Sequence, residues 1–126
     1  MNVYNSLTRR LEPLTPIADN TIRLYTCGPT VYNFAHIGNF RAYTFEDILR
    51  RVIEFNGMKV KQVMNLTDVD DKTIRGANAQ GVALTTYTKT YKDAFFADLK
   101  KLNIESAEIY GSSCMTVGIR SRHNLI

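Results

Sequence analysis

The feature that most constrains the fold is a strand–helix–strand pattern in the first half of the chain. Residues 22–27, "IRLYTC", are rich in β-branched and aromatic residues and lead into a Gly28-Pro29 turn, which predicts a short buried strand. Residues 40–56 change to helical spacing, and residues 58–66, "MKVKQVMNL", alternate as a second strand. Such a crossover gives parallel strands and is almost always right-handed. The pattern therefore predicts an α/β fold.

The helix predicted over residues 40–56 has two different faces. Gly57 follows it as a C-terminal cap. The pattern places apolar residues on one face and charged residues on the other, and the Arg50-Arg51 pair is most simply a solvated surface. The apolar face contains Phe45, Ile48, Leu49, Val52 and Ile53, and the charged face contains Glu46, Asp47, Arg50 and Arg51.

Two further helices are predicted after the second strand. The acidic residues of "TDVDDK" (67–72) suit the positive end of a helix that runs to about Gln80 and ends at Gly81. Thr85 is a plausible cap for another helix that runs to about Leu102. The final segment has neither a helical nor a strand period, so no element is predicted there.

Composition narrows the class of protein. A chain of 126 residues has room for one domain with one core, and its 44% hydrophobic and 22% charged residues are ordinary for a globular protein. No apolar run approaches the roughly 20 residues of a membrane span, and the N-terminus lacks a signal-peptide core. We therefore expect a cytoplasmic protein with no membrane partner. The net charge of +4 permits an anionic partner such as a nucleotide or RNA.

The two cysteines, Cys27 and Cys114, lie far apart in the sequence. Neither has a second cysteine two to four residues away, so no complete zinc site is evident locally. Three interpretations of Cys27 remain: a buried core residue, a nucleophile with His36 as its base, or one ligand of a metal site completed elsewhere. The residues alone favour the core position.

Polar residues follow both predicted strands, where open α/β sheets bind their ligands. His36 and Gly38 lie just before the long helix, whose N-terminus suits a phosphate group. His36 either donates to a phosphate oxygen or is a surface or capping histidine. Thr67 and Asp68 end the second strand, and they either hold a polar substrate, with the carboxylate pairing with an ammonium group, or cap the next helix.

Taken together, "YTCGPTVYNFAHIGNFRAYTFEDILRR" and "NLTDVDDKTI" closely resemble the N-terminal part of the catalytic domain of the cysteinyl-tRNA synthetase family. That family belongs to the class I aminoacyl-tRNA synthetases. The resemblance runs from about Tyr4 to about Ile109. It implies an incomplete Rossmann-like parallel sheet and two reactions, in which cysteine and ATP form cysteinyl-adenylate and the acyl group then passes to tRNA(Cys). Members of the family are usually monomeric.

The resemblance also implies roles for individual residues. "HIGN" is similar to the family's HIGH signature, so His36 and Asn39 would contact the ATP phosphates, and Gly38 would let the adenine lie close to the backbone. The signature often has histidine where this chain has Asn39, which leaves the role of that position open. Cys27 matches the first of the family's zinc ligands, and the metal binds the thiolate of the substrate. The cysteine pocket would be lined by Gly28, Thr30, Thr67 and Asp68.

The resemblance separates residues 1–109 from a divergent tail, residues 110–126. The family's other zinc ligands, its KMSKS-type loop and its tRNA-binding region come later, and Cys114 and His123 do not match those ligands in position. A frameshift, a premature stop or a gene fragment would produce such a tail. Two alternatives to a cysteine–tRNA ligase fragment therefore stay open. One is an inactive remnant or weak nucleotide-binding module, and the other is a ligase that joins activated cysteine to an amino-sugar thiol precursor.

Overall fold

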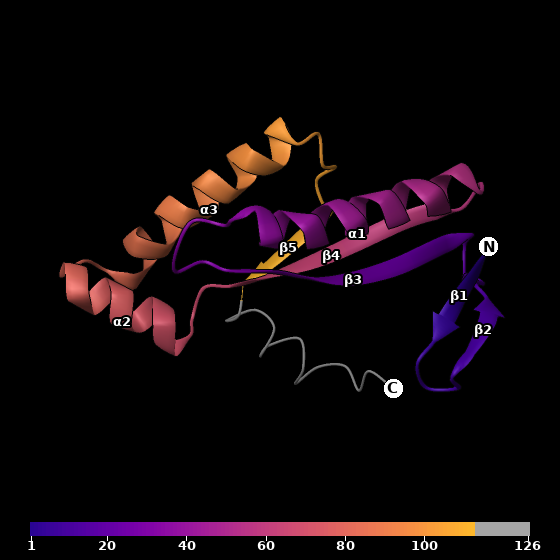
Figure 1. Cartoon of the computed structure of the whole chain (residues 1–126), viewed down its shortest axis with the longest axis horizontal. Coiled ribbons are helices and arrows are strands. Elements are labelled where there is room, and N and C mark those ends of the chain that lie inside the picture. The colour runs from indigo at the N-terminus through magenta and orange to yellow at the C-terminus, as the bar shows by residue number, and fades with distance from the viewer. Residues whose placement is uncertain (113–126) are drawn as a thin grey trace.

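The structure is a computed structural model that describes residues 1–112 of the chain (Figure 1). A three-stranded parallel sheet has the order β3-β4-β5, and a separate antiparallel hairpin is formed by β1 (Asn2–Asn5) and β2 (Arg10–Pro13). The sheet contains β3 (Thr21–Thr30), β4 (Lys59–Thr67) and β5 (Ile109–Ser112), and the helices are α1 (Ile37–Phe55), α2 (Asp71–Gln80) and α3 (Leu84–Lys101).

The predicted strand–helix–strand unit is confirmed. Strand β3 pairs with β4 in parallel through the α1 crossover, and β4 pairs with β5 through the α2–α3 pair. The register places Tyr25, Val63 and Ile109 in one row across the sheet, and Cys27 beside Asn65 in the next row of the same face. This architecture is an incomplete Rossmann-like α/β fold, as predicted.

The predicted turn at Gly28-Pro29 is wrong. Both residues lie inside β3, which continues to Thr30 through a shift in register after Cys27. At Gly28 the two strands come so close that an added Cβ would lie 2.2 Å from the backbone oxygen of Asn65. Glycine is therefore required here for close approach of the backbones rather than for a turn.

The predicted orientation of α1 is also wrong. Phe45, on the supposed buried stripe, is 66% exposed, and Ile48 and Val52 are exposed too, whereas Ile53 is 1% exposed. Asp47, assigned to the solvent face, is buried instead. The polar face turns inward because the segment between α3 and β5 supplies partners that lie more than 50 residues away in sequence.

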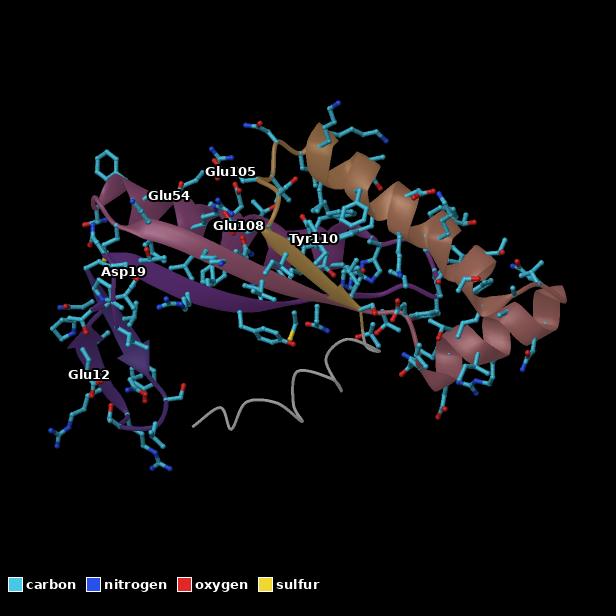
Figure 2. All side chains as sticks on the ribbon, turned by 180° about the vertical axis from the view of Figure 1, so that it is seen from behind. Glu12, Asp19, Glu54, Glu105, Glu108 and Tyr110 are labelled. Atoms are coloured by element: carbon cyan, nitrogen blue, oxygen red, sulfur yellow. The ribbon has the colours of Figure 1, made fainter. Side chains whose placement is uncertain are left out.

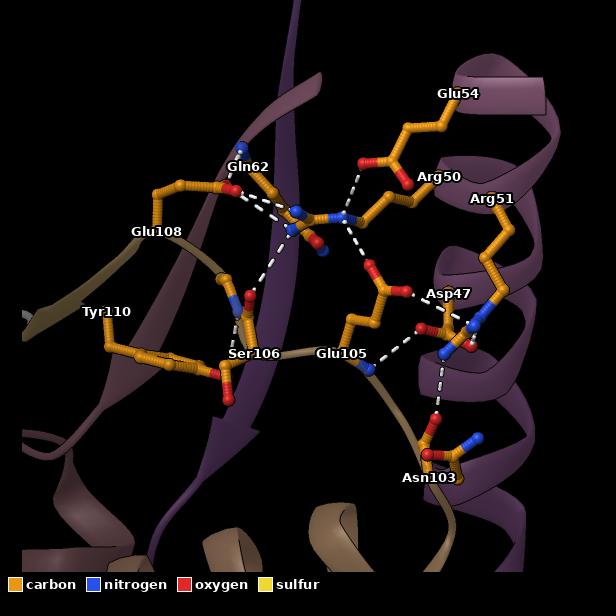
Figure 3. Close-up of polar contacts among 11 residues, drawn as sticks. Asp47, Arg50, Arg51, Glu54, Gln62, Asn103, Glu105, Ser106, Glu108 and Tyr110 are labelled. Atoms are coloured by element: carbon orange, nitrogen blue, oxygen red, sulfur yellow. Dashed lines mark hydrogen bonds and ion pairs between the residues drawn. The ribbon is translucent and has the colours of Figure 1, made fainter. Parts of the chain in front are cut away.

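Those partners form a polar cluster, called here the clamp: Asp47, Arg50 and Arg51 of α1, Gln62 of β4, and Glu105 and Glu108 (Figure 3). Arg50 Nη2 lies 2.7 Å from Glu108 Oε1, and Arg50 Nε lies 3.0 Å from Glu105 Oε2. Glu108 also accepts the backbone N–H of Gln62. The Arg50 side chain is only 11% exposed, so the expectation of a solvated arginine pair is wrong for Arg50.

Figure 2 shows Glu54, Glu105 and Glu108 gathered along α1, whereas Glu12 and Asp19 lie toward the hairpin. Glu54, Glu105 and Glu108 all lie where they form ion pairs with Arg50.

The apolar core lies between the sheet, α1 and α3. Its centre is an aromatic group in which the rings of Phe40 and Phe95 lie 6.3 Å apart and those of Tyr43 and Phe95 lie 5.2 Å apart. Met64 and Leu66 of β4 complete the contact with the sheet. On the opposite face of the sheet, Tyr25 is 60% exposed. The core thus supports the half of α1 that carries the predicted site.

Helix α2 begins as the sequence predicts, and helix α3 does not. Asp70 caps α2 by accepting the Lys72 N–H at 2.8 Å, and Gly81 ends the helix with a φ of 64°. Helix α3 begins at Leu84, without a side-chain cap, so Thr85 is not its cap. Within residues 1–112, none of the helices combines the length and the apolar character needed to cross a membrane.

Candidate functional site

The carboxyl ends of β3 and β4 lie at one edge of the sheet, beside α2 and α3 (Figure 1). The loop after β3 leads into α1, and the loop after β4 leads into α2. The two strand ends are joined where the N–H of Val31 donates to the carbonyl of Thr67 at 3.0 Å. The polar residues near these strand ends are called here the crevice: Cys27, Thr30, His36, Asn39, Thr67 and Asp68. Thr30, His36 and Asn39 line one cavity, and Asp68 lines a different one.

His36 is the N-cap of α1. Its Nδ1 accepts the N–H of Gly38 at 3.0 Å, and its own N–H donates to Asn39 Oδ1 at 3.1 Å. The capping interpretation of His36 is therefore confirmed. With Nδ1 accepting, a neutral imidazole carries its hydrogen on Nε2, where it can donate to an anion. Capping and phosphate binding are thus compatible in one side chain.

Gly38 lets the imidazole of His36 fold over the first turn of α1. An added Cβ at Gly38 would lie 2.8 Å from His36 Cε1. His36, Asn39 and Thr30 line a cavity of about 220 Å³ in front of this helix N-terminus. Gly38, Arg41, Ala42 and Phe45 line a second cavity of about 380 Å³. A helix N-terminus beside such cavities suits a phosphate-containing ligand.

Cys27 is exposed, so the expectation of a core cysteine is wrong. The neighbouring Thr26 is the buried residue, because it faces α1 and accepts a hydrogen bond from Gln62 Nε2 at 3.1 Å. Within residues 1–112, no group of three or more metal-binding side chains comes together around Cys27 or elsewhere. Cys114 and His123 lie outside the described residues.

Thr67 and Asp68 follow β4. The hydroxyl of Thr67 accepts Asn65 Nδ2 at 3.3 Å, and Thr67 lies opposite Thr30 in the register. Asp68 does not cap α2, because Asp70 does so. Its Oδ2 lies 2.7 Å from Lys92 Nζ of α3, so its carboxylate already has a cationic neighbour.

Two titratable groups of α1 near the strand end keep their protons more firmly than usual. Burial, followed by the charges of Glu46 and Cys27, raises the pKa of Tyr43 to about 12. Burial also raises the pKa of Glu46, against a hydrogen bond from Thr26 that lowers it. Tyr43 is therefore not suited to act as a base at neutral pH.

Nothing in the sequence marks Lys92 or Tyr87 as a residue of the site. Tyr87 Oη donates to the carbonyl of Tyr32 at 2.7 Å, in the loop that precedes His36. In the sequence, Lys92 is a lysine beside Tyr91 on a helix with several aromatic residues, which is a weak indication of a site. The sequence does not reveal the acidic partner of Lys92, because Asp68 lies 24 residues earlier in the chain.

Comparison with known proteins agrees with this geometry. The family model "tRNA synthetases class I (C) catalytic domain" matches residues 13–118. The cysteine–tRNA ligase of Protochlamydia amoebophila is 66% identical over 110 residues, covering 87% of this chain and 23% of that protein. The cysteine–tRNA ligase of Brachyspira hyodysenteriae is 59% identical over 106 residues, covering 84% of this chain and 22% of that protein.

The chain thus spans less than a quarter of the length of these curated relatives. The match includes both loops of the crevice and the whole of α1. The resemblance of its motifs, its parallel α/β sheet and the family match lead to one conclusion: the chain belongs to the class I tRNA synthetase family, in the group with the cysteine-type catalytic domain.

Proposed function

We propose that this chain forms the N-terminal part of the catalytic domain of a cysteine–tRNA ligase. Its reaction activates cysteine with ATP and transfers the cysteinyl group to tRNA(Cys). The observation that carries the proposal is the crevice, where a histidine-capped helix N-terminus follows the strand that carries the exposed Cys27. The identity to proteins named cysteine–tRNA ligase supports the choice of amino acid.

In the first step, a carboxylate oxygen of cysteine attacks the α-phosphorus of ATP. A P–O bond forms to the amino acid, and the bond to pyrophosphate breaks. We expect His36 Nε2–H and the Asn39 amide group, at the positive end of the α1 dipole, to stabilise the negative charge on the phosphates. Gly38 leaves its backbone accessible to the adenine.

Recognition of the amino acid rests on the strand ends. Cys27 has the exposed thiol that a zinc site requires, and it would supply one ligand while the others come from outside residues 1–112. When bound, zinc supplies a soft Lewis acid that distinguishes a thiolate from the hydroxyl of serine. Gly28, Thr30, Thr67 and Asp68 would line the rest of the pocket. Asp68 serves there while paired with Lys92.

Membership of this family supports tRNA(Cys), cysteine and ATP as the partners of the complete protein, and we propose a monomer in the cytoplasm. We expect residues 1–126 alone to be inactive. This expectation rests on the described residues, among which no group of three or more potential metal ligands comes together.

A chimera tests the function. The matching 110 residues of this chain would replace their counterpart in the Protochlamydia amoebophila relative. We expect cysteine-dependent exchange of pyrophosphate into ATP, with serine at least about 100-fold less effective. A folded chimera without exchange, beside an active unmodified relative, would refute the proposal.

A further inference from the structure

One short stretch of α3, residues 87–92, contacts both loops of the crevice. Tyr87 and Tyr91 lie against the loop that follows β3, and Lys92 lies against the loop that follows β4. Figure 1 shows α3 beside the turn of chain that enters α1. A single rigid helix therefore connects the loop that leads to His36 with the loop that begins at Asp68.

The contact with the first loop is made to its backbone. Tyr87 Oη donates to the carbonyl of Tyr32 at 2.7 Å, four residues before His36. The tyrosine ring is buried against Gly76 of α2, where an added Cβ would lie 2.2 Å from Oη. Because Gly76 leaves room for the ring and α2 closes it in from that side, the hydroxyl has a fixed position.

Aromatic and cationic contacts strengthen the same attachment. The rings of Phe34 and Tyr91 meet edge to face at 5.1 Å, and Tyr87 meets Tyr91 at the same distance. Lys72 Nζ of α2 lies 4.9 Å from the ring centroid of Tyr32. The loop thus has three points of contact with α2 and α3, whereas His36 itself is fixed by the local cap alone among the hydrogen bonds of the described residues.

The contact with the second loop is an ion pair. Lys92 Nζ lies 2.7 Å from Asp68 Oδ2, and the two side chains are 26% and 14% exposed. Shielding of this kind makes the pair stronger than a fully exposed one. It also places a positive charge beside the carboxylate that follows Thr67, which reduces repulsion between Asp68 and an anionic ligand in the crevice.

We propose that Tyr87 and Lys92 are positioning residues that hold the two loops of the crevice in a fixed relation through α3. The inference rests on the proposed function, because adenylation requires the cysteine carboxylate and the α-phosphorus of ATP to be aligned. Tyr87 acts on the loop that carries His36 and Asn39. Lys92 acts on the loop that carries Thr67 and Asp68.

Hydrogen exchange on the 126-residue chain tests the positioning without any activity. Tyr87→Phe removes only the hydroxyl, and we expect the hydrogen-bonded amides of Val31 and Tyr32 to exchange about fivefold faster. Lys92→Met should instead accelerate the exchange of the Asp70 and Lys72 amides.

Matched controls are Tyr4→Phe on the hairpin and Lys101→Met at the far end of α3, where the lysine side chain is 75% exposed. Unchanged exchange, or a uniform rise across the whole sheet, would overturn the proposal.

Kinetics of the chimera separate positioning from a general loss of structure. Tyr87→Phe should raise the KM for ATP more than the KM for cysteine, and Lys92→Met should do the opposite. Equal changes in both constants for both variants would overturn the proposal. If the parent chimera shows no pyrophosphate exchange, the proposed function fails, while the hydrogen-exchange result still decides whether α3 holds the two loops.

Discussion

The clamp and the crevice use similar polar residues in opposite ways. In the clamp, Arg50 lies against Glu54, Glu105 and Glu108, and its side chain is nearly buried. In the crevice, the hydrogen bonds of His36 and Asn39 among the described residues join them to each other and to the first turn of α1, and both residues remain exposed. The clamp residues form ion pairs and hydrogen bonds with distant parts of the chain, whereas these two crevice residues form hydrogen bonds with immediate neighbours.

This difference separates residues that maintain the fold from residues available to a ligand. Burying charged groups costs free energy unless partners offset it, so the clamp exists only when α1, β4 and the segment before β5 are assembled. Cys27, His36 and Asn39 of the crevice contribute little to assembly because they are exposed. We infer that the clamp stabilises the sheet and that the crevice carries the chemistry.

Replacing Arg50 should produce the largest loss of stability. Arg50→Met keeps an apolar stem but leaves Glu105 and Glu108 without their central cation. We expect a loss of about 2 kcal/mol in the free energy of unfolding, less than for a fully buried pair because these carboxylates are partly exposed. Urea denaturation of the 126-residue chain measures it, with Lys101→Met as the exposed-pair control. Equal midpoints for the two variants would contradict the role of the clamp.

The second-largest loss of stability should come from lowering the pH, which weakens the clamp. Burial alone would raise the pKa of Glu108, but hydrogen bonds from the Gln62 backbone and Arg50, together with the charge of Arg50, hold it below the usual 4.5. A carboxyl with a lowered pKa in the folded state contributes stability above its unfolded-state pKa, and this is lost as pH falls through the folded value. Glu46, whose pKa is raised by burial, has the opposite sign.

We therefore expect the melting temperature to fall as the pH is lowered below about 4.5, and Glu108→Gln to flatten this fall. Thermal melts of both proteins between neutral and acidic pH measure the difference. An equal loss of stability on acidification in Glu108→Gln and in the parent would contradict this prediction. It would mean that the charge of Glu108 does not hold β5 to β4.

The smallest effect on stability is expected in the crevice. Cys27→Ser should change the free energy of unfolding by less than about 0.5 kcal/mol, because the side chain is exposed. The same change in the chimera should lower its zinc content, measured by elemental analysis of the dialysed protein. A large loss of stability with unchanged zinc content would return Cys27 to a structural role.

The sequence predicts local features of this molecule and misses the distant ones. The β3–α1–β4 unit and the cap role of His36 follow from patterns within a few residues. The inward face of α1 does not, because Asp47 is buried by a bond to the Glu105 N–H at 2.8 Å, 58 residues later. The pairing of Asp68 with Lys92 likewise depends on how α3 packs. Cys27 is exposed because it lies on the face of the sheet opposite the core.

The most direct measurement compares His36→Ala with Arg50→Met in the chimera, at a temperature at which both variants remain folded. His36→Ala should lower pyrophosphate exchange by at least about 100-fold and cost only about 1 kcal/mol as a lost cap. Arg50→Met should melt earlier and keep its exchange rate within about threefold of the parent, since a fold residue away from the reacting atoms removes no transition-state contact.

His36→Asn is the matched control, because asparagine preserves a helix cap and lacks the imidazole. It should melt like the parent and still lose exchange. We therefore expect the rate of pyrophosphate exchange to depend on His36 and the melting temperature to depend on Arg50. Full exchange in His36→Ala, or loss of exchange in a folded Arg50→Met, would contradict this expectation.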